Sequence, residues 1–191
     1  MDAARALQRA DSRGHVVIRK AQGFALIDMI FVTGIIGLLA SIAMPRLIMA
    51  KQSASTASAI GTMRTIASSQ LSYALTCASG FYAPTLTTLG QPPAGSTESF
   101  ITPGLGSANT VVKSAYTIQM TASPFPGAPA TCNGLGAGNA GQAFVAGADP
   151  TEPSNTRFFA TNANNVIYEH NASLYAVMPE TGAPAIGQIL K

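Results

Sequence analysis

The chain has 191 residues, enough for one ordinary domain with a helical appendage but with little room for a second core. Only 10% of the residues are charged, against roughly 25% in soluble domains, and 8 acidic residues with 2 His are a thin supply for acid–base or metal chemistry. The formal charge of +3 lies wholly in residues 1–23, which disfavours a basic nucleic-acid-binding face on a folded domain.

The first 23 residues are basic. They carry five basic side chains against two acidic ones, whereas basic and acidic residues balance from position 24 onward. The basic residues are Arg5, Arg9, Arg13, Arg19 and Lys20. A basic flank before an apolar run stays in the cytoplasm during membrane insertion. We therefore expect residues 1–23 to be a cytoplasmic leader.

Residues 24–44 form an apolar run of 21 residues with one charge, Asp28. As a helix this run is roughly 32 Å long, enough to cross a hydrocarbon core of about 30 Å. The alternative is a secretory signal peptide cut after Ser41 and Ala43. Such peptides usually have an apolar region of about 7–15 residues, so the length favours a retained transmembrane helix.

Asp28 is the most informative residue of the sequence. A carboxylate near the centre of a membrane helix costs about 2.5–3.5 kcal/mol, so such residues are usually functional and partnered. The alternative is an acid close enough to the helix end to reach the lipid headgroups. The apolar run contains no cation, so a partner has to come from another chain or from an amine created by cutting the leader.

The stretch Gly23-Phe24-Ala25-Leu26-Ile27-Asp28, continuing through apolar residues to Pro45, resembles the N-terminus of type IV pilins and type II secretion pseudopilins. In that family a basic leader ends in Gly, Phe follows, and an acid stands five residues after the junction. Counted from Phe24, Asp28 is fifth, Gly37 fourteenth and Pro45 twenty-second, as in the family. The family's acid is normally Glu, and Asp is one methylene shorter.

The resemblance implies that a prepilin peptidase cuts between Gly23 and Phe24 and methylates the new amine of Phe24. It implies that residues 24–45 mediate assembly through Asp28, Gly37 and Pro45, with Asp28 pairing with that amine on an adjacent subunit. The implied partners are further copies of the chain or other pilins, the peptidase, the inner-membrane assembly machinery and, before assembly, the lipid bilayer. The precursor then sits in a bacterial inner membrane with its head in the periplasm, and the filament is periplasmic or extracellular.

Beyond Met44 the helical pattern continues as an amphipathic half over residues 46–76. Small or apolar residues recur at steps of three and four. They are Leu47, Ala50, Ala54, Ala57, Ile60, Met63, Ala67, Leu71 and Ala74. We expect one helix from Phe24 to about Thr76, with this stripe packed on a sheet.

Residues 77–191 have the composition of a loop-rich globular head. We expect an irregular region at 78–110, strands at 114–121, 142–146, 156–161 and 166–169, and a flexible tail at 176–191. The residues Asn162–Asn165 predict a hairpin between the last two strands. The predicted fold is α+β and pilin-like, a long N-terminal helix packed on a small antiparallel sheet.

Cys77 and Cys132 are the only cysteines, and both follow the apolar run on the expected exterior side. An oxidising compartment favours a disulfide between them. Neither has a His or second Cys at the spacing of metal ligands. Many pilins carry their disulfide around a C-terminal loop instead. The pairing expected here is therefore inferred from the oxidising compartment and the number of cysteines, and not from the resemblance.

Three further patterns carry weaker chemical signals. Gly136–Gly141 matches G-x-G-x-x-G, but without the strand and helix that a phosphate site needs, so a loop is expected. His170 follows Glu169 with no nucleophile or metal set beside it, which favours a surface histidine. Asp149 and Glu152 flank Pro150 but are too few to predict a calcium site. We expect no catalytic residue, metal or cofactor.

The predicted function is a structural subunit of a type IV pilus or pilin-like filament rather than an enzyme. Two alternatives stay open. The first is a pseudopilin of a type II secretion system, which shares the same N-terminal pattern. The second is a single-span anchor that retains residues 1–23, never polymerises and holds a periplasmic binding domain.

Overall fold

The computed structural model describes residues 26–190, so Gly23 and Phe24 lie outside the described residues. The described residues divide into two units, one up to Pro45 and the other from Arg46 onward. The elements are α1 (Leu26–Thr76), α2 (Leu86–Gly90), α3 (Pro103–Gly106), β1 (Thr110–Lys113), β2 (Tyr116–Thr121), β3 (Val145–Pro150), β4 (Phe158–Asn162), β5 (Ile167–His170) and β6 (Gln188–Ile189). The predicted α+β layout, a long N-terminal helix with a small antiparallel sheet, is confirmed.

Helix α1 continues through Pro45 and ends at Thr76, where the sequence predicted its end. The backbone turns left-handed at Ser79 and Gly80, and the N–H of Gly80 donates to the carbonyl of Ala74 at 2.8 Å. This contact satisfies a carbonyl that the end of a helix otherwise leaves without a partner. A local signal therefore stops the helix before Cys77.

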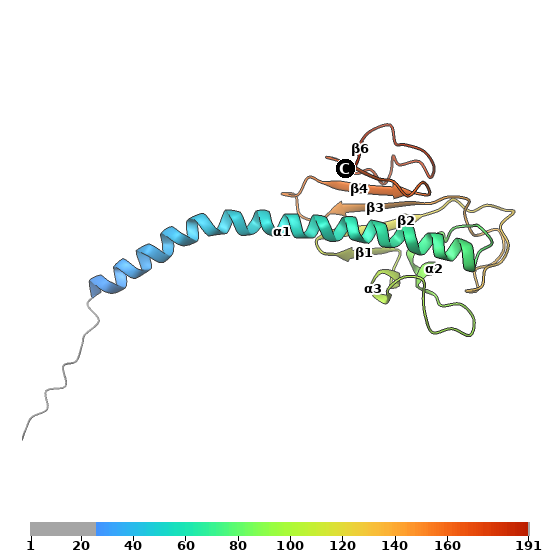
Figure 1. Cartoon of the computed structure of the whole chain (residues 1–191), viewed down its shortest axis with the longest axis horizontal. Helices are drawn as coiled ribbons and strands as arrows, with labels where there is room; N and C mark the ends of the chain where they lie inside the picture. Colours follow the sequence, from blue (N-terminus) through green and yellow to red (C-terminus); the bar gives the residue numbers. More distant parts are fainter. Residues whose placement is uncertain (1–25, 191) are drawn as a thin grey trace, which may run out of the picture. The chain divides into compact units, whose positions relative to one another are not determined.

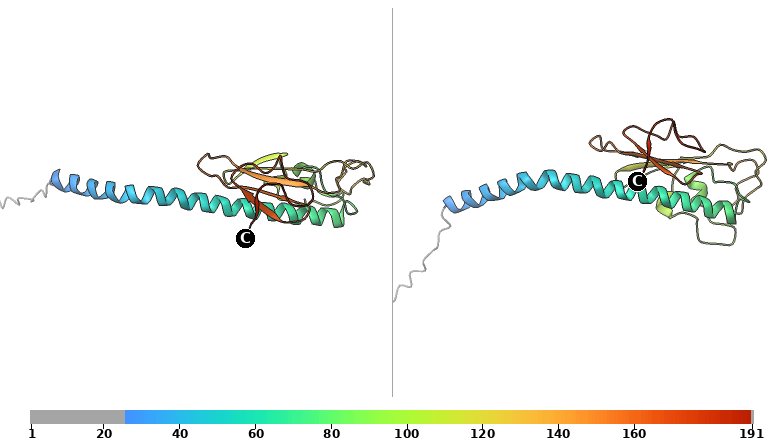
Figure 2. Two further views of the ribbon diagram at one scale, coloured as in Figure 1. Left: turned by 90° about the horizontal axis from the view of Figure 1, so that it is seen from above. Right: turned by 45° about the horizontal axis from the view of Figure 1, so that its top comes forward.

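The six strands form one antiparallel sheet in the order β1-β2-β3-β4-β5-β6, so each strand pairs with its neighbour in sequence (Figure 1). The β4–β5 hairpin predicted around Asn162–Asn165 is present, with Phe159 opposite Glu169. Asn165 takes the left-handed conformation at φ 59°, which asparagine tolerates better than most residues. The strands lie along the distal part of α1 in both views of Figure 2.

Side chains alternate between the two faces of this sheet. One face packs with α1 into the main core, which includes Met63, Ile66, Ile118, Phe159 and Ile167. The next residue along two of these strands, Ala160 or Tyr168, belongs instead to a second cluster with Val145, Leu174 and Met178. Because the side-chain period of a strand is two, this register gives the head two apolar layers with the sheet between them.

The buried face of α1 differs from the predicted stripe. Met63, Ala67 and Ala74 are buried as predicted, but Ala54, Ala57 and other members of the stripe are exposed. The buried positions also include the polar residues Thr56, Thr62, Ser69 and Gln70. The burial of Gln70 has a clear cause: its side-chain N–H donates to the carbonyl of Ala83 at 2.8 Å, and its side-chain oxygen accepts from the N–H of Ala83 at 2.9 Å. A fully paired amide can be buried without the usual penalty.

Two strand predictions need correction. The strand predicted at 142–146 is β3, which starts at Val145 and extends to Pro150. The strand predicted at 114–121 starts at Tyr116, because Ser114 and Ala115 form the turn from β1 with φ values of 50° and 62°. The region 78–110, predicted to be irregular, contains α2 and α3 and the first residue of β1.

The C-terminal segment predicted as a flexible tail is attached to the head. Met178 is buried in the cluster on one face of the sheet, and β6 pairs with β5. The side-chain amide of Asn162 donates to the carbonyls of Pro179 and Gly182 at 2.9 and 2.7 Å. The asparagines that predicted the hairpin therefore also hold this segment, which the sequence pattern did not indicate.

Candidate functional site

The first unit contributes the apolar part of α1, residues 26–45. Its large apolar side chains are between 42% and 76% exposed, and none belongs to a core. Each such side chain left in water forgoes roughly 1.5–3 kcal/mol of burial. Summed over the segment this exceeds the stability of an ordinary domain, about 5–15 kcal/mol, so the segment has a strong tendency to leave water. The helix is long and apolar enough to cross a membrane.

Hydroxyl groups in this segment are satisfied by the helix itself. Thr33 Oγ1 donates to the carbonyl of Met29 at 2.9 Å, and Ser41 Oγ donates to the carbonyl of Leu38 at 2.8 Å. Such local bonds allow Ser and Thr to lie in an apolar environment. Asp28, in the first turn of α1, is the one charged residue between positions 24 and 45. Its carboxylate is the group of this segment that most needs an external partner.

Gly37 and Pro45, the other predicted assembly residues on α1, both lie in the apolar segment. A Cβ added at Gly34 or Gly37 meets no atom within 4 Å, so both glycines present bare backbone on the helix surface. A glycine inside a helix costs about 1 kcal/mol relative to alanine, and glycines three or four apart let a second helix approach closely. Pro45 has no N–H for the carbonyl of Ser41.

The predicted cleavage and methylation site, Gly23 and Phe24, lies outside the described residues. The residues predicted to mediate assembly, Asp28, Gly37 and Pro45, all lie on one continuous helix. Leu47, predicted to pack on the sheet, is exposed instead, and the sequence pattern missed its exposed apolar neighbours Ile48 and Met49. These three residues are apolar in the sequence, but Pro45 and Arg46 separate them from the apolar run, so the sequence predicts that the run ends before Pro45.

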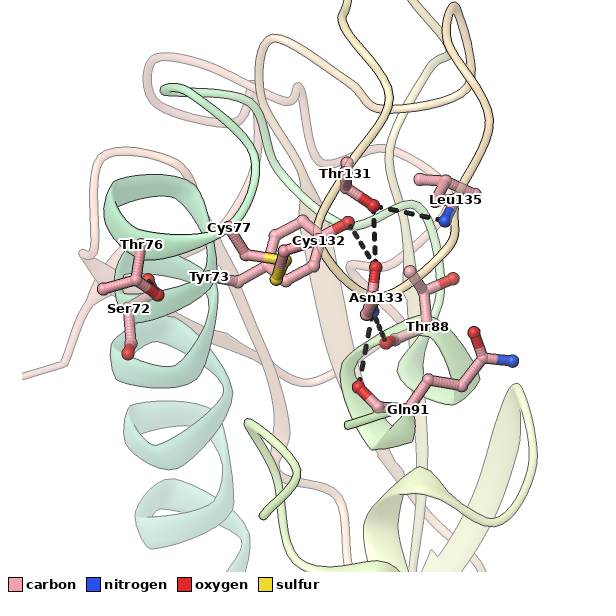
Figure 3. Close-up of a disulfide and its surroundings, with 10 residues drawn as sticks. All are labelled: Ser72, Tyr73, Thr76, Cys77, Thr88, Gln91, Thr131, Cys132, Asn133 and Leu135. Carbon is pink, nitrogen blue, oxygen red and sulfur yellow. Dashed lines mark hydrogen bonds between the residues drawn. A yellow bond between two sulfur atoms is a disulfide. The ribbon is translucent and has the colours of Figure 1, made fainter. Parts of the chain in front are cut away.

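The predicted disulfide between Cys77 and Cys132 is present, with the two Cα atoms 4.9 Å apart (Figure 3). It joins the residue after α1 to the long loop between β2 and β3. The N–H of Cys132 also donates to the carbonyl of Cys77 at 3.1 Å. The bridge therefore lies in a closely paired piece of backbone and closes the head at the end of α1.

A polar network surrounds this bridge. Asn133 Oδ1 accepts from Thr131 Oγ1 at 2.7 Å and from the hydroxyl of Tyr73 at 3.4 Å, while its amide donates to the carbonyl of Thr88 at 2.7 Å (Figure 3). Burial raises the pKa of Tyr73 above its ordinary value. Asn133 thus connects α1, α2 and the loop, and the arrangement is structural.

An open surface cavity of about 550 Å³ lies beside β4 and β5. Its charged side chains already bind one another: the guanidinium of Arg157 pairs with Glu169, and Gln188 donates to the other oxygen of Glu169 at 3.1 Å. The hydrogen bond from Arg157 holds the pKa of Glu169 below its ordinary value. His170 Nδ1 accepts from the N–H of Ala172 at 3.2 Å, and within residues 26–190 no ion pair joins His170 to Glu169.

The remaining candidate sites from the sequence are not formed: their residues bind different partners, or the flanking strand and helix are missing. The segment Gly136–Gly141 lies in the loop between β2 and β3 and is not flanked by the strand and helix of a phosphate site. Asp149 accepts from Ser173 Oγ at 2.6 Å, whereas Glu152 pairs with Lys51 at 2.7 Å. Within residues 26–190 no three His, Cys, Asp or Glu side chains gather in the manner of a metal site.

Comparison with known proteins identifies no relative of this chain. No protein-family model, no curated protein and no solved structure matches the chain.

Proposed function

We propose that the chain is a structural subunit of a type IV pilus or a related pilin-like filament, processed by a prepilin peptidase and polymerised through residues 24–45. The observation that carries the proposal is the apolar part of α1, whose large side chains are exposed and whose one charge is Asp28. This segment needs lipid before assembly and neighbouring helices after it. The pilin-like reading of the α+β fold belongs to the same proposal.

The position of Asp28 supports this choice. Asp28 is the fifth residue after the junction between Gly23 and Phe24. Cutting after Gly23 therefore creates an amine on Phe24 that is close in sequence to the carboxylate. A carboxylate and an ammonium are each costly in lipid but acceptable as a pair. When the partner amine belongs to an adjacent subunit, the pair fixes the register between helices as well as adding affinity.

Gly34 and Gly37 support close packing of the same segment. Both expose backbone without any contact inside the described part of the chain. Helices that meet in lipid gain mainly by packing, which small residues permit. A pseudopilin of a type II secretion system has the same N-terminal requirements, and these observations support both members of the family equally.

The mature mass tests the proposal. We expect membranes of the producing bacterium to contain a chain that begins at Phe24 and carries one added methyl group, because the junction lies between the basic leader and the apolar helix. Gly23→Leu should leave the precursor uncut. Gly14→Leu, which alters a glycine within the same basic leader, is the matched control and should be processed normally.

Two results contradict the proposal. A chain that retains residues 1–23 and their mass supports the single-span anchor. A chain that begins at Met44 identifies residues 24–43 as an ordinary signal peptide and removes the assembly segment altogether.

A further inference from the structure

Three consecutive apolar residues follow Pro45 and Arg46 at the start of the second unit. Leu47, Ile48 and Met49, the apolar collar, are 71%, 57% and 58% exposed. The first buried residue of α1 is Thr56, so the core of the head leaves the collar uncovered. Successive helical residues point about 100° apart, and the collar therefore faces most of the helix circumference. A protein docked on one side of the helix would leave part of it in water.

Two basic residues, Arg46 and Lys51, lie close to the collar in sequence. The ammonium of Lys51 is 2.7 Å from a carboxylate oxygen of Glu152, which balances its charge within the head. Arg46 is exposed and has no ion-pair partner among residues 26–190. The exposed surface at this point of α1 thus combines apolar side chains on several sides with one available guanidinium.

The length of the apolar helix indicates what covers this surface. Residues 26–49 in α-helix extend about 36 Å, some 6 Å more than a hydrocarbon core of about 30 Å. The collar is the last part of that length, so it falls at the boundary between acyl chains and headgroups. An arginine at such a boundary keeps its aliphatic stem beside lipid and extends its guanidinium to the phosphates. A membrane interface surrounds a helix on all sides, as the collar requires.

We propose that the apolar collar and Arg46 form a membrane-interface anchor. The collar lies at the boundary between the acyl chains and the headgroups of the outer leaflet, and Arg46 binds the phosphates of anionic phospholipids. This inference rests on the membrane insertion in the proposed function. It goes further by extending the lipid-contacting part of the chain four residues past Pro45 and by assigning a lipid ligand to Arg46.

Tryptophan fluorescence tests the anchor, because the chain contains no Trp. The full chain is placed in vesicles whose phosphatidylglycerol and phosphatidylcholine carry bromine either near the headgroup or deep in the acyl chain. Ile48→Trp reports on the collar, Ile42→Trp on the apolar run, and Leu75→Trp on the exposed end of α1 in the head. We expect quenching of Ile48→Trp chiefly by the shallow bromines, a larger share of quenching by the deep bromines for Ile42→Trp, and no quenching of Leu75→Trp.

The three tryptophan variants distinguish failure of the anchor from failure of membrane insertion. If Ile42→Trp is quenched and Ile48→Trp is not, the anchor is overturned while membrane insertion stands. If Ile48→Trp is shielded only after copies of the chain assemble, a neighbouring subunit covers the collar and the anchor is again overturned. If Ile42→Trp is not quenched at all, membrane insertion fails and the anchor fails with it.

The charge of Arg46 is tested on the Ile48→Trp background. Arg46→Glu should lose shallow quenching in vesicles rich in phosphatidylglycerol and lose less in pure phosphatidylcholine, since repulsion requires an anionic surface. Lys113→Glu makes the same change of charge at an exposed residue of β1 and is the matched control. Equal losses from the two variants, or none from Arg46→Glu, overturn the assignment of a lipid phosphate to Arg46.

Discussion

Gly90 and Gly106 allow α2 and α3 to touch through their backbones. A Cβ added at Gly106 would lie 2.5 Å from the Cα of Gly90, and one added at Gly90 would lie 2.7 Å from the carbonyl oxygen of Gly106. Backbone atoms cannot yield as the end of a flexible side chain can. Glycine is therefore required at both positions by space rather than by conformation, since neither has a positive φ.

This contact predicts the effect of a single methyl group. Gly106→Ala should lower the free energy of unfolding by about 1–3 kcal/mol, the usual cost of overpacking. Denaturant unfolding of the full chain in detergent measures it, followed by the near-ultraviolet signal of the tyrosines. Gly104→Ala lies in the same short helix and meets no atom within 4 Å, so it should be neutral or slightly stabilising. Equal losses from the two variants would contradict the backbone contact.

At the scale of elements, the disulfide fastens a loop that has no strand or helix of its own between β2 and β3. Cys77 and Cys132 are 55 residues apart, and closing a loop of that size stabilises a fold by roughly 4 kcal/mol in the chain-entropy model. We expect the exported protein to resist thiol alkylation in denaturant until a reductant is added. Ready labelling of both cysteines without reductant would show that the bridge does not form in the cell.

Local patterns predicted the elements whose signals are local. The long run of helical spacing predicted α1 to Thr76, and the asparagines at 162–165 predicted the β4–β5 hairpin. Strand β1 was missed because its turn uses Ser114 and Ala115 in left-handed conformations, where a sequence reader expects Asn or Gly. The sequence did not predict that Gln70 belongs to the buried face of α1. Its side-chain amide is paired with the backbone of Ala83, a contact that only the folded chain creates.

The candidate site divides in the same way. The apolar length and the positions of Asp28, Gly37 and Pro45 could be read directly, because membrane insertion depends on composition and spacing along one helix. The exposure of the apolar collar could not, since the same residues would be buried if the head's core began two or more turns earlier. Tertiary packing decides that point, and it begins at Thr56.

At the scale of the whole molecule, one helix serves two environments. Residues from Thr56 onward hold the core of the head, while the exposed apolar residues before them are left, in the proposed function, for lipid and for other subunits. Asp28 lies in the first turn of α1, outside every buried cluster of the head. A change at Asp28 should therefore act on assembly without disturbing the fold of the head.

Asp28→Ala should insert into the membrane, lose its leader and form the Cys77–Cys132 disulfide normally, yet incorporate poorly into filaments, because the amine of Phe24 on the adjacent subunit loses its partner. Sheared filament fractions and membrane fractions, compared by immunoblot, measure this incorporation, and resistance to alkylation confirms that the head is folded. Asp28→Glu restores the length of the family's usual acid and should incorporate at least as well as the parent chain. If Asp28→Ala enters filaments as readily as the parent, pairing of Asp28 does not drive assembly, and other contacts of the chain hold the subunits together.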